Sequence, residues 1–76
     1  MNKMRRNKLS TIVDRLEDLK SQLEDIRDEE QDAYDNMPEG LQMSDRGMAS
    51  EEAISNMEDA IDELDSVIEA ISNASF

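Results

Sequence analysis

Two long stretches of the chain place apolar residues at alternating spacings of three and four, the pattern of an α-helix with one apolar side. The first stretch contains Leu9, Ile12, Leu16, Leu19, Leu23, Ile26 and Ala33, and Glu30 interrupts it once. The second contains Ile54, Met57, Ile61, Leu64, Ile68 and Ile71. The spacing predicts one helix over residues 9–35 and a second over residues 45–73.

Residues 36–47 connect the two predicted helices and contain the only proline and both glycines of the chain. Pro38 disfavours helical backbone at Met37, so the first helix is expected to end before it. The connection is longer than a tight helical hairpin needs. A short helical turn that begins at Pro38 fits within it. We interpret this segment as a structural corner in which Leu41 and Met43 cover the end of the helices; a recognition loop is the alternative.

The second predicted helix has another apolar column beside its main seam. Its members recur every seven residues: Ala53, Ala60, Val67 and Ala74. Because small side chains let a neighbouring helix approach closely, we interpret the apolar stripe as wide rather than as a narrow two-stranded seam. Ser44 and Ser50 are the candidate N-caps of this helix.

Two helices of similar length, each with one apolar side, predict an all-α fold, an antiparallel two-helix hairpin in a single domain over residues 1–76. A chain of 76 residues without cysteine buries little surface and gains nothing from disulfides. We therefore expect two hairpins to dimerise into a four-helix bundle. One continuous coiled coil is the alternative, which Pro38, Gly40 and Gly47 disfavour. The expected core and dimer residues are Leu16, Leu19, Leu23, Ile26, Ile54, Met57, Ile61, Leu64 and Ile68.

The charges are distributed unevenly along a chain with 20 acids, 8 bases and a net charge of -12. Residues 1–20 contain six of the bases, and no base follows Arg46. We expect residues 1–8 to form a basic, flexible arm. In the first helix the other bases, Arg15, Lys20 and Arg27, flank the apolar seam, where they can pair with acids of a neighbouring helix.

Between Glu51 and Glu69 the second helix contains eight carboxylates and no base. They are Glu51, Glu52, Glu58, Asp59, Asp62, Glu63, Asp65 and Glu69. All of them lie outside the apolar seam, and like charges three or four residues apart cost about 0.2–0.5 kcal/mol each. At 1.5 Å per residue they supply one charge per ~3.4 Å of helix axis, which is the phosphate spacing of a DNA strand. This helix therefore has enough charge to occupy a DNA-binding groove.

Several kinds of chemistry are missing from the sequence. The chain contains no His and no Cys, so an imidazole base, a thiolate nucleophile and the usual zinc ligands are all absent. Asp35–Arg46 fails the EF-hand pattern, because Met37 stands at its third position and Arg46 at its last. We expect a protein that is not an enzyme and binds no cofactor or metal.

The basic N-terminus is not followed by a long apolar run, so neither a signal peptide nor a membrane span is expected.

Residues 34–47, YDNMPEGLQMSDRG, and residues 51–62, EEAISNMEDAID, resemble a widespread group of small helical proteins of phages and mobile elements of Gram-positive bacteria. The resemblance covers residues 9–72 and implies a phage origin, with action in the cytoplasm of the host bacterium. In size and charge the chain is similar to the acidic, dimeric DNA mimics with which Bacillus phages inhibit the nucleoid protein HU.

These patterns predict a phage-type DNA mimic that uses its eight α-helical carboxylates to bind a basic host nucleic-acid-binding protein such as HU. The net negative charge repels nucleic acid and anionic membranes, so direct binding to either is not expected. Two alternatives remain open. In one, the chain is a structural or oligomerisation module whose acids confer solubility. In the other, it is an anti-defence or transcription-modulating protein that acts through residues 34–47.

Overall fold

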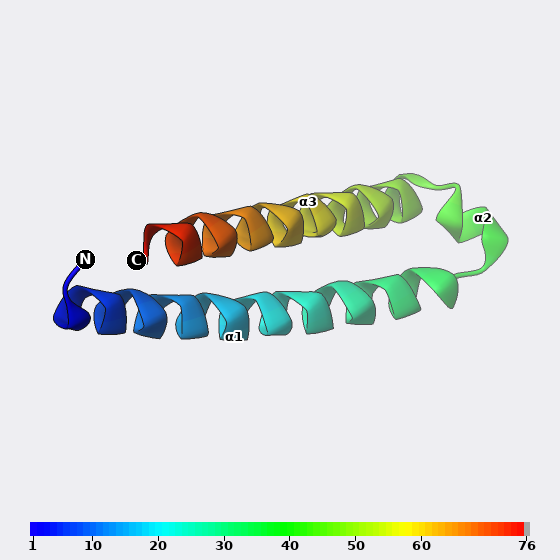
Figure 1. The fold of residues 1–76 in the computed structure, drawn as a ribbon. Helices are drawn as coiled ribbons and strands as arrows, with labels where there is room; N and C mark the ends of the chain where they lie inside the picture. The colour runs from blue at the N-terminus through cyan, green and yellow to red at the C-terminus, as the bar shows by residue number, and fades with distance from the viewer. Residues whose placement is uncertain (76) are drawn as a thin grey trace.

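The computed structural model describes residues 1–75 as a long, narrow pair of helices joined by a short one (Figure 1). In chain order these are α1 (Lys3–Asp35), α2 (Glu39–Gln42) and α3 (Asp45–Ala74). The helices α1 and α3 lie side by side and run in opposite directions, so both chain ends lie at one end and α2 at the other (Figure 1). The pair measures 58 × 15 × 12 Å. The all-α fold class is therefore confirmed.

The first helix begins at Lys3, within the segment that was expected to be a flexible arm over residues 1–8. Asn2 is its N-cap, because its side-chain oxygen accepts a hydrogen bond of 2.9 Å from the backbone N–H of Arg5. A cap of this kind satisfies one of the free N–H groups of the first turn. Since no Gly or Pro interrupts residues 3–35, the helix continues without a break to Asp35.

Gly47 fixes the connection between the long helices through a hydrogen bond to Ser44 and a close approach to the backbone of Gln42. The N-cap of α3 is Ser44, whose hydroxyl accepts a hydrogen bond of 3.5 Å from the backbone N–H of Gly47. A Cβ atom at Gly47 would lie 2.1 Å from the carbonyl oxygen of Gln42, so only glycine fits there. The side-chain amide of Gln42 in turn donates a hydrogen bond of 2.9 Å to the carbonyl oxygen of Tyr34. The corner is thus tied to the last turn of α1.

The apolar residues of the connection do not cover the end of the helix pair. Leu41 is 48% exposed and Met43 is 77% exposed. The sequence-based expectation that they close the end is wrong for the hairpin, although the backbone of Gln42 in α2 lies close to Gly47 of α3. Met43 is largely in solvent, and Leu41 is about half covered.

The side of α3 that faces α1 is the apolar seam expected from the sequence, extended by two turns towards the corner. Its most covered side chains are Ile54 and Ile61, which are 7% and 5% exposed, together with Gly47 and Ser50. The remaining seam residues are half-buried; they are Met57, Leu64, Ile68 and Ile71. Within residues 1–75, Ile54 and Ile61 are the only apolar side chains of the hairpin that are buried, so the core is thin.

The side of α1 that faces α3 differs from the expected seam. The half-buried residues along it are Leu9, Val13, Leu16, Lys20, Leu23, Arg27, Glu30 and Tyr34. The predicted core residues Leu19 and Ile26 are each 54% exposed, and Ile12 is 45% exposed. At 100° per residue their row lies about 80° around the helix from the direction of α3. The apolar stripe of α1 is therefore wider than one neighbouring helix covers, and the hairpin alone does not bury its outer part.

Candidate acidic binding surface

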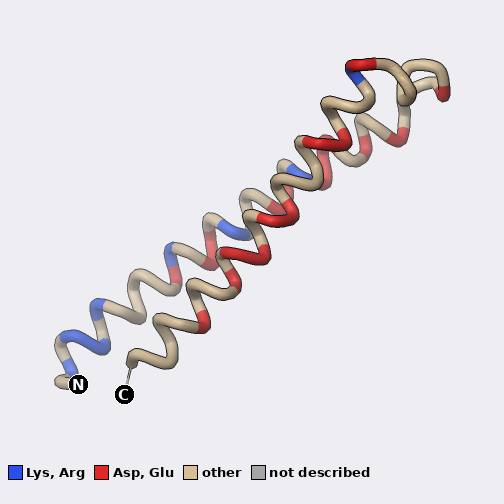
Figure 2. The backbone as a smooth tube through the Cα atoms, turned by 90° about the horizontal axis from the view of Figure 1, so that it is seen from above, with Lys and Arg blue, Asp and Glu red and all other residues tan. Residues whose placement is uncertain are grey.

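All eight carboxylates of α3 that were expected to bind a partner are exposed, and we call them the acidic face of α3. They are Glu51, Glu52, Glu58, Asp59, Asp62, Glu63, Asp65 and Glu69. They cover about 160° of the helix circumference at 100° per residue, on the side away from the buried seam. Figure 2 shows red carboxylate positions along α3, whereas most of the blue Lys and Arg positions lie along α1.

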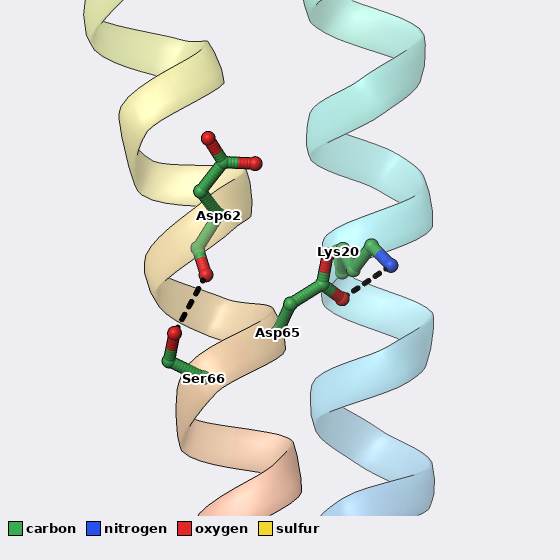
Figure 3. A network of polar contacts seen from close by, with 4 residues as sticks. All are labelled: Lys20, Asp62, Asp65 and Ser66. Atoms are coloured by element: carbon green, nitrogen blue, oxygen red, sulfur yellow. Dashed lines mark hydrogen bonds and ion pairs between the residues drawn. The ribbon is translucent and has the colours of Figure 1, made fainter.

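Two members of the acidic face are bonded to α1. The ammonium group of Lys20 donates to a carboxylate oxygen of Asp65 at 2.6 Å (Figure 3). The phenol of Tyr34 donates a hydrogen bond to the carboxylate of Glu51. Asp62, one turn before Asp65, directs its carboxylate away from Lys20 (Figure 3). Both contacts hold acidic residues against α1, so these two carboxylates stabilise the hairpin as well as contributing charge.

The protonation of both α1 donors responds to these contacts. The hydrogen bond to Asp65 raises the pKa of Lys20 above its usual value, and its partial burial opposes that effect. The hydrogen bond to Glu51 raises the pKa of Tyr34, and burial and the negative charges of Glu51 and Asp35 add to the rise. At neutral pH Lys20 therefore neutralises Asp65 locally, whereas the uncharged Tyr34 leaves the charge of Glu51 in place.

The other six members of the acidic face have no cationic partner within residues 1–75. They are Glu52, Glu58, Asp59, Asp62, Glu63 and Glu69. The guanidinium of Arg27, expected to pair with an acid of a neighbouring helix, instead pairs with Asp28 of its own helix at 3.0 Å. The middle of α3 therefore presents uncompensated negative charge to solvent, the property that a basic partner surface would recognise.

A third polar contact between the long helices does not follow from the apolar pattern of the sequence. The hydroxyl of Ser50, which is buried, donates a hydrogen bond of 2.6 Å to the carboxylate of Glu30. The apolar pattern indicates Glu30 only as an interruption of the first seam, and Ser50 only as a candidate N-cap. An acid inside one seam and a hydroxyl on the seam side of the other helix are complementary, and that complementarity was the available signal.

The bases of the N-terminal segment form a separate surface at the open end of the hairpin. Lys3, Arg5, Arg6 and Lys8 lie on the first turns of α1, and residues 1–8 contain no acid. The opposite end of the same helix is acidic, since residues 28–35 contain five acids and no base. Figure 2 shows this change from blue to red along α1. The helix is thus strongly bipolar.

Within residues 1–75 the structure shows neither a metal-binding cluster nor a helix that could span a membrane. No group of three or more carboxylates in this range is arranged to hold a metal ion. None of the helices described has an apolar stretch long enough to cross a lipid bilayer. Comparisons of the chain with protein-family models, with curated proteins and with solved structures found no match.

Proposed function

We propose that the protein is a phage-type DNA mimic that binds a basic host DNA-binding protein, such as HU, and blocks its binding of DNA. The observation that supports this most is the set of six exposed carboxylates of α3 without a cationic partner. Lys and Arg side chains that hold phosphates also form charge-assisted hydrogen bonds with carboxylates. The protein acts by occupying those cations, not by catalysis.

The charge of the whole molecule supports a protein partner over a nucleic acid or a membrane. With a net charge of -12 the chain repels DNA, RNA and anionic lipid. It attracts a basic groove over distances comparable to the Debye length, which is about 10 Å at 0.1 M salt. The proposal therefore predicts displacement of DNA from its partner at low salt and much weaker displacement at high salt.

The test is a competition experiment with purified HU and fluorescently labelled DNA. Wild-type protein is expected to release the DNA at low ionic strength. A variant with four neutralised carboxylates of α3 is expected to lose most of this activity; its substitutions are Glu58→Gln, Asp59→Asn, Asp62→Asn and Glu63→Gln. If the wild-type protein releases no DNA at low salt, HU is not the partner.

A matched control removes the same number of charges from α1. It contains Asp14→Asn, Glu17→Gln, Asp25→Asn and Glu29→Gln, and all four of these residues are exposed. Both variants have the same net charge and the same change in residue types. If the two variants compete equally, the total charge of the protein matters and the acidic face of α3 is not the binding surface.

A structural or oligomerisation module is the second candidate, and the exposed row of Ile12, Leu19 and Ile26 favours it. In this proposal two hairpins cover one another's apolar surface and form a four-helix bundle, and the carboxylates serve solubility. Sedimentation of the wild-type protein tests the assembly. The competition experiment with the wild-type protein and the α3 variant separates the two candidates. A purely structural module binds no DNA-binding protein, so neither form of it would displace DNA from HU.

Action through residues 34–47 is favoured only by the exposure of Leu41 and Met43 at the tip of the hairpin. Apolar side chains at such a tip can insert into a pocket of a partner. Substitution of Leu41 and Met43 by Ser, with the helix content unchanged, separates this candidate from the acidic face. Loss of activity in that variant, with the α3 variant fully active, would favour the tip.

A further inference from the structure

One face of the hairpin is apolar and lies opposite its polar contacts. We call the residues Ile12, Leu19 and Ile26 the outer row of α1; they are seven residues apart and therefore lie on one side of the helix. They are about half exposed in the hairpin. The contacts Lys20–Asp65 and Tyr34–Glu51 lie on the other side of the plane that contains α1 and α3, by the same geometry of 100° per residue.

The third helix contributes to the same apolar face. Its column of small and apolar residues, Ala53, Ala60, Val67 and Ala74, lies about 90° around α3 from the direction of α1. Because the two helices are antiparallel, this rotation brings the column to the face on which the outer row of α1 lies. Val67 is exposed there. The hairpin thus has an uncovered apolar face, while most of its acidic face points to the other side and outward.

The charges of α1 identify what fits against this face. Residues 1–8 have four bases and no acid, and residues 28–35 have five acids and no base. Leu19 is the midpoint of the helix Lys3–Asp35. A second α1 placed antiparallel, with a two-fold axis at Leu19, brings Ile12 level with Ile26 of the other copy. The same arrangement brings the basic end of each helix level with the acidic end of the other.

A parallel arrangement has the opposite electrostatic effect. It places the four bases of one copy beside the same four bases of the other, and it does the same with the five acids. Like charges opposed across an interface destabilise it, and opposite charges steer association. The core of the hairpin is thin, since Ile54 and Ile61 are its only buried apolar side chains within residues 1–75. A chain with so small a core gains stability when a second copy buries more of its apolar surface.

We infer that a second copy of this chain covers the outer row of α1 in antiparallel orientation, with the two-fold axis at Leu19 and the two connections at opposite ends. This inference rests on the proposed dimerisation and is independent of the proposed basic partner. Both acidic faces of α3 remain outside in this dimer. The proposed dimer and the proposed binding function are therefore compatible.

The orientation is tested by disulfide formation between introduced cysteines, since the chain has none of its own. Arg5 and Ala33 belong to the same heptad position as the outer row, and the two-fold axis at Leu19 brings them level across the dimer. Within one chain they are about 42 Å apart along α1 at 1.5 Å per residue, so they cannot bond to each other. An Arg5→Cys variant and a size-tagged Ala33→Cys variant are mixed, oxidised and separated by non-reducing electrophoresis.

The expected product is the mixed disulfide, in excess of the share that random pairing gives. Glu17→Cys mixed with Ser21→Cys is the matched control, because these residues are also level across the axis but lie on the other side of α1; it should give no cross-link. Predominant self-disulfides of Arg5→Cys would show a parallel dimer and overturn the inference. Cross-linking of the control pair would show that the wrong face was chosen.

Sedimentation of the wild-type protein completes the test. A protein that remains monomeric at the concentrations used for cross-linking overturns both the inference and the proposed dimerisation. A dimer that yields self-disulfides overturns the orientation alone. Failure to displace DNA from HU affects neither result, because the cross-linking experiment contains no other protein.

Discussion

The ammonium group of Lys20 lies 2.6 Å from the carboxylate of Asp65 and joins the middle of α1 to α3. Lys20 lies on the side of α1 that faces α3, whereas the apolar pattern alone places its neighbour Leu19 in the core. Its partner is one of the eight carboxylates of the acidic face. This contact is one of three polar contacts between the long helices, and it neutralises one carboxylate of the acidic face.

Replacing Asp65 by Asn is expected to lower the melting temperature of the hairpin, because Lys20 loses its ionic partner. The difference should shrink at high salt, since exposed charges are screened. Circular dichroism melts at low and high salt measure both effects. The matched change Glu63→Gln removes an acid without a cationic partner and should leave the melting temperature equal or higher. A lower melting temperature for Glu63→Gln than for Asp65→Asn would contradict the role assigned to Lys20.

Tyr34 is the only tyrosine of a chain without tryptophan, so its ionisation can be followed directly by ultraviolet absorbance. The hydrogen bond to Glu51 raises its pKa, and the titration midpoint is expected above the usual value of about 10. Glu51→Gln should lower the midpoint. An unchanged midpoint in Glu51→Gln would show that the contact is absent in solution.

The same two pKa shifts predict how stability depends on pH. Lys20 and Tyr34 both have a raised pKa in the folded chain, so their contributions are fully present below their unfolded pKa values of about 10. The contributions are lost as the pH rises through the folded pKa values. The free energy of unfolding in urea should therefore be constant from pH 7 to about pH 9.5 for these groups and fall above it. The double variant Asp65→Asn/Glu51→Gln should show a smaller alkaline loss.

Gly47→Ala is expected to destabilise the protein by about 1–3 kcal/mol, the usual cost of overpacking, because the new Cβ would lie 2.1 Å from the carbonyl oxygen of Gln42. Gly40→Ala is the control, since a Cβ there meets no atom within 4 Å. It should be neutral or stabilise by up to about 1 kcal/mol through the unfolded chain. Urea unfolding of both variants measures the contrast, and equal effects would refute the close contact at Gly47.

Leu19→Asn is expected to weaken self-association strongly while leaving the hairpin folded, because Leu19 is exposed in the single chain and covered in the proposed dimer. Removal of a buried leucine side chain costs about 2–5 kcal/mol in a core. Ser21→Asn, at an exposed position on the other side of α1, should not change association. Sedimentation equilibrium gives the dissociation constants. Equal constants for Leu19→Asn and the wild type would place the interface elsewhere.

Part of the candidate site could be predicted from the sequence because exposure follows from helix geometry. The eight carboxylates of α3 lie outside a seam of Ile, Leu and Met at regular spacing, and a helix that buries that seam has to expose them. Their bonding to α1 could not be predicted in the same way. Whether Asp65 or Asp62 meets Lys20 depends on the axial register of two helices, which the spacing within each helix does not contain.

The sequence by itself determined that two long helices form, that the first of them ends before Pro38, and which side of α3 is buried. Local hydrogen bonding and apolar spacing within one helix suffice for these features. Only the tertiary structure decided which side of α1 faces α3. The apolar stripe of α1 is wide enough for two neighbours, so burial of Leu19 or of Lys20 is compatible with the pattern. The choice depends on contacts across the helix pair, from Lys20 to Asp65, from Glu30 to Ser50 and from Tyr34 to Glu51, which satisfy polar groups at the interface.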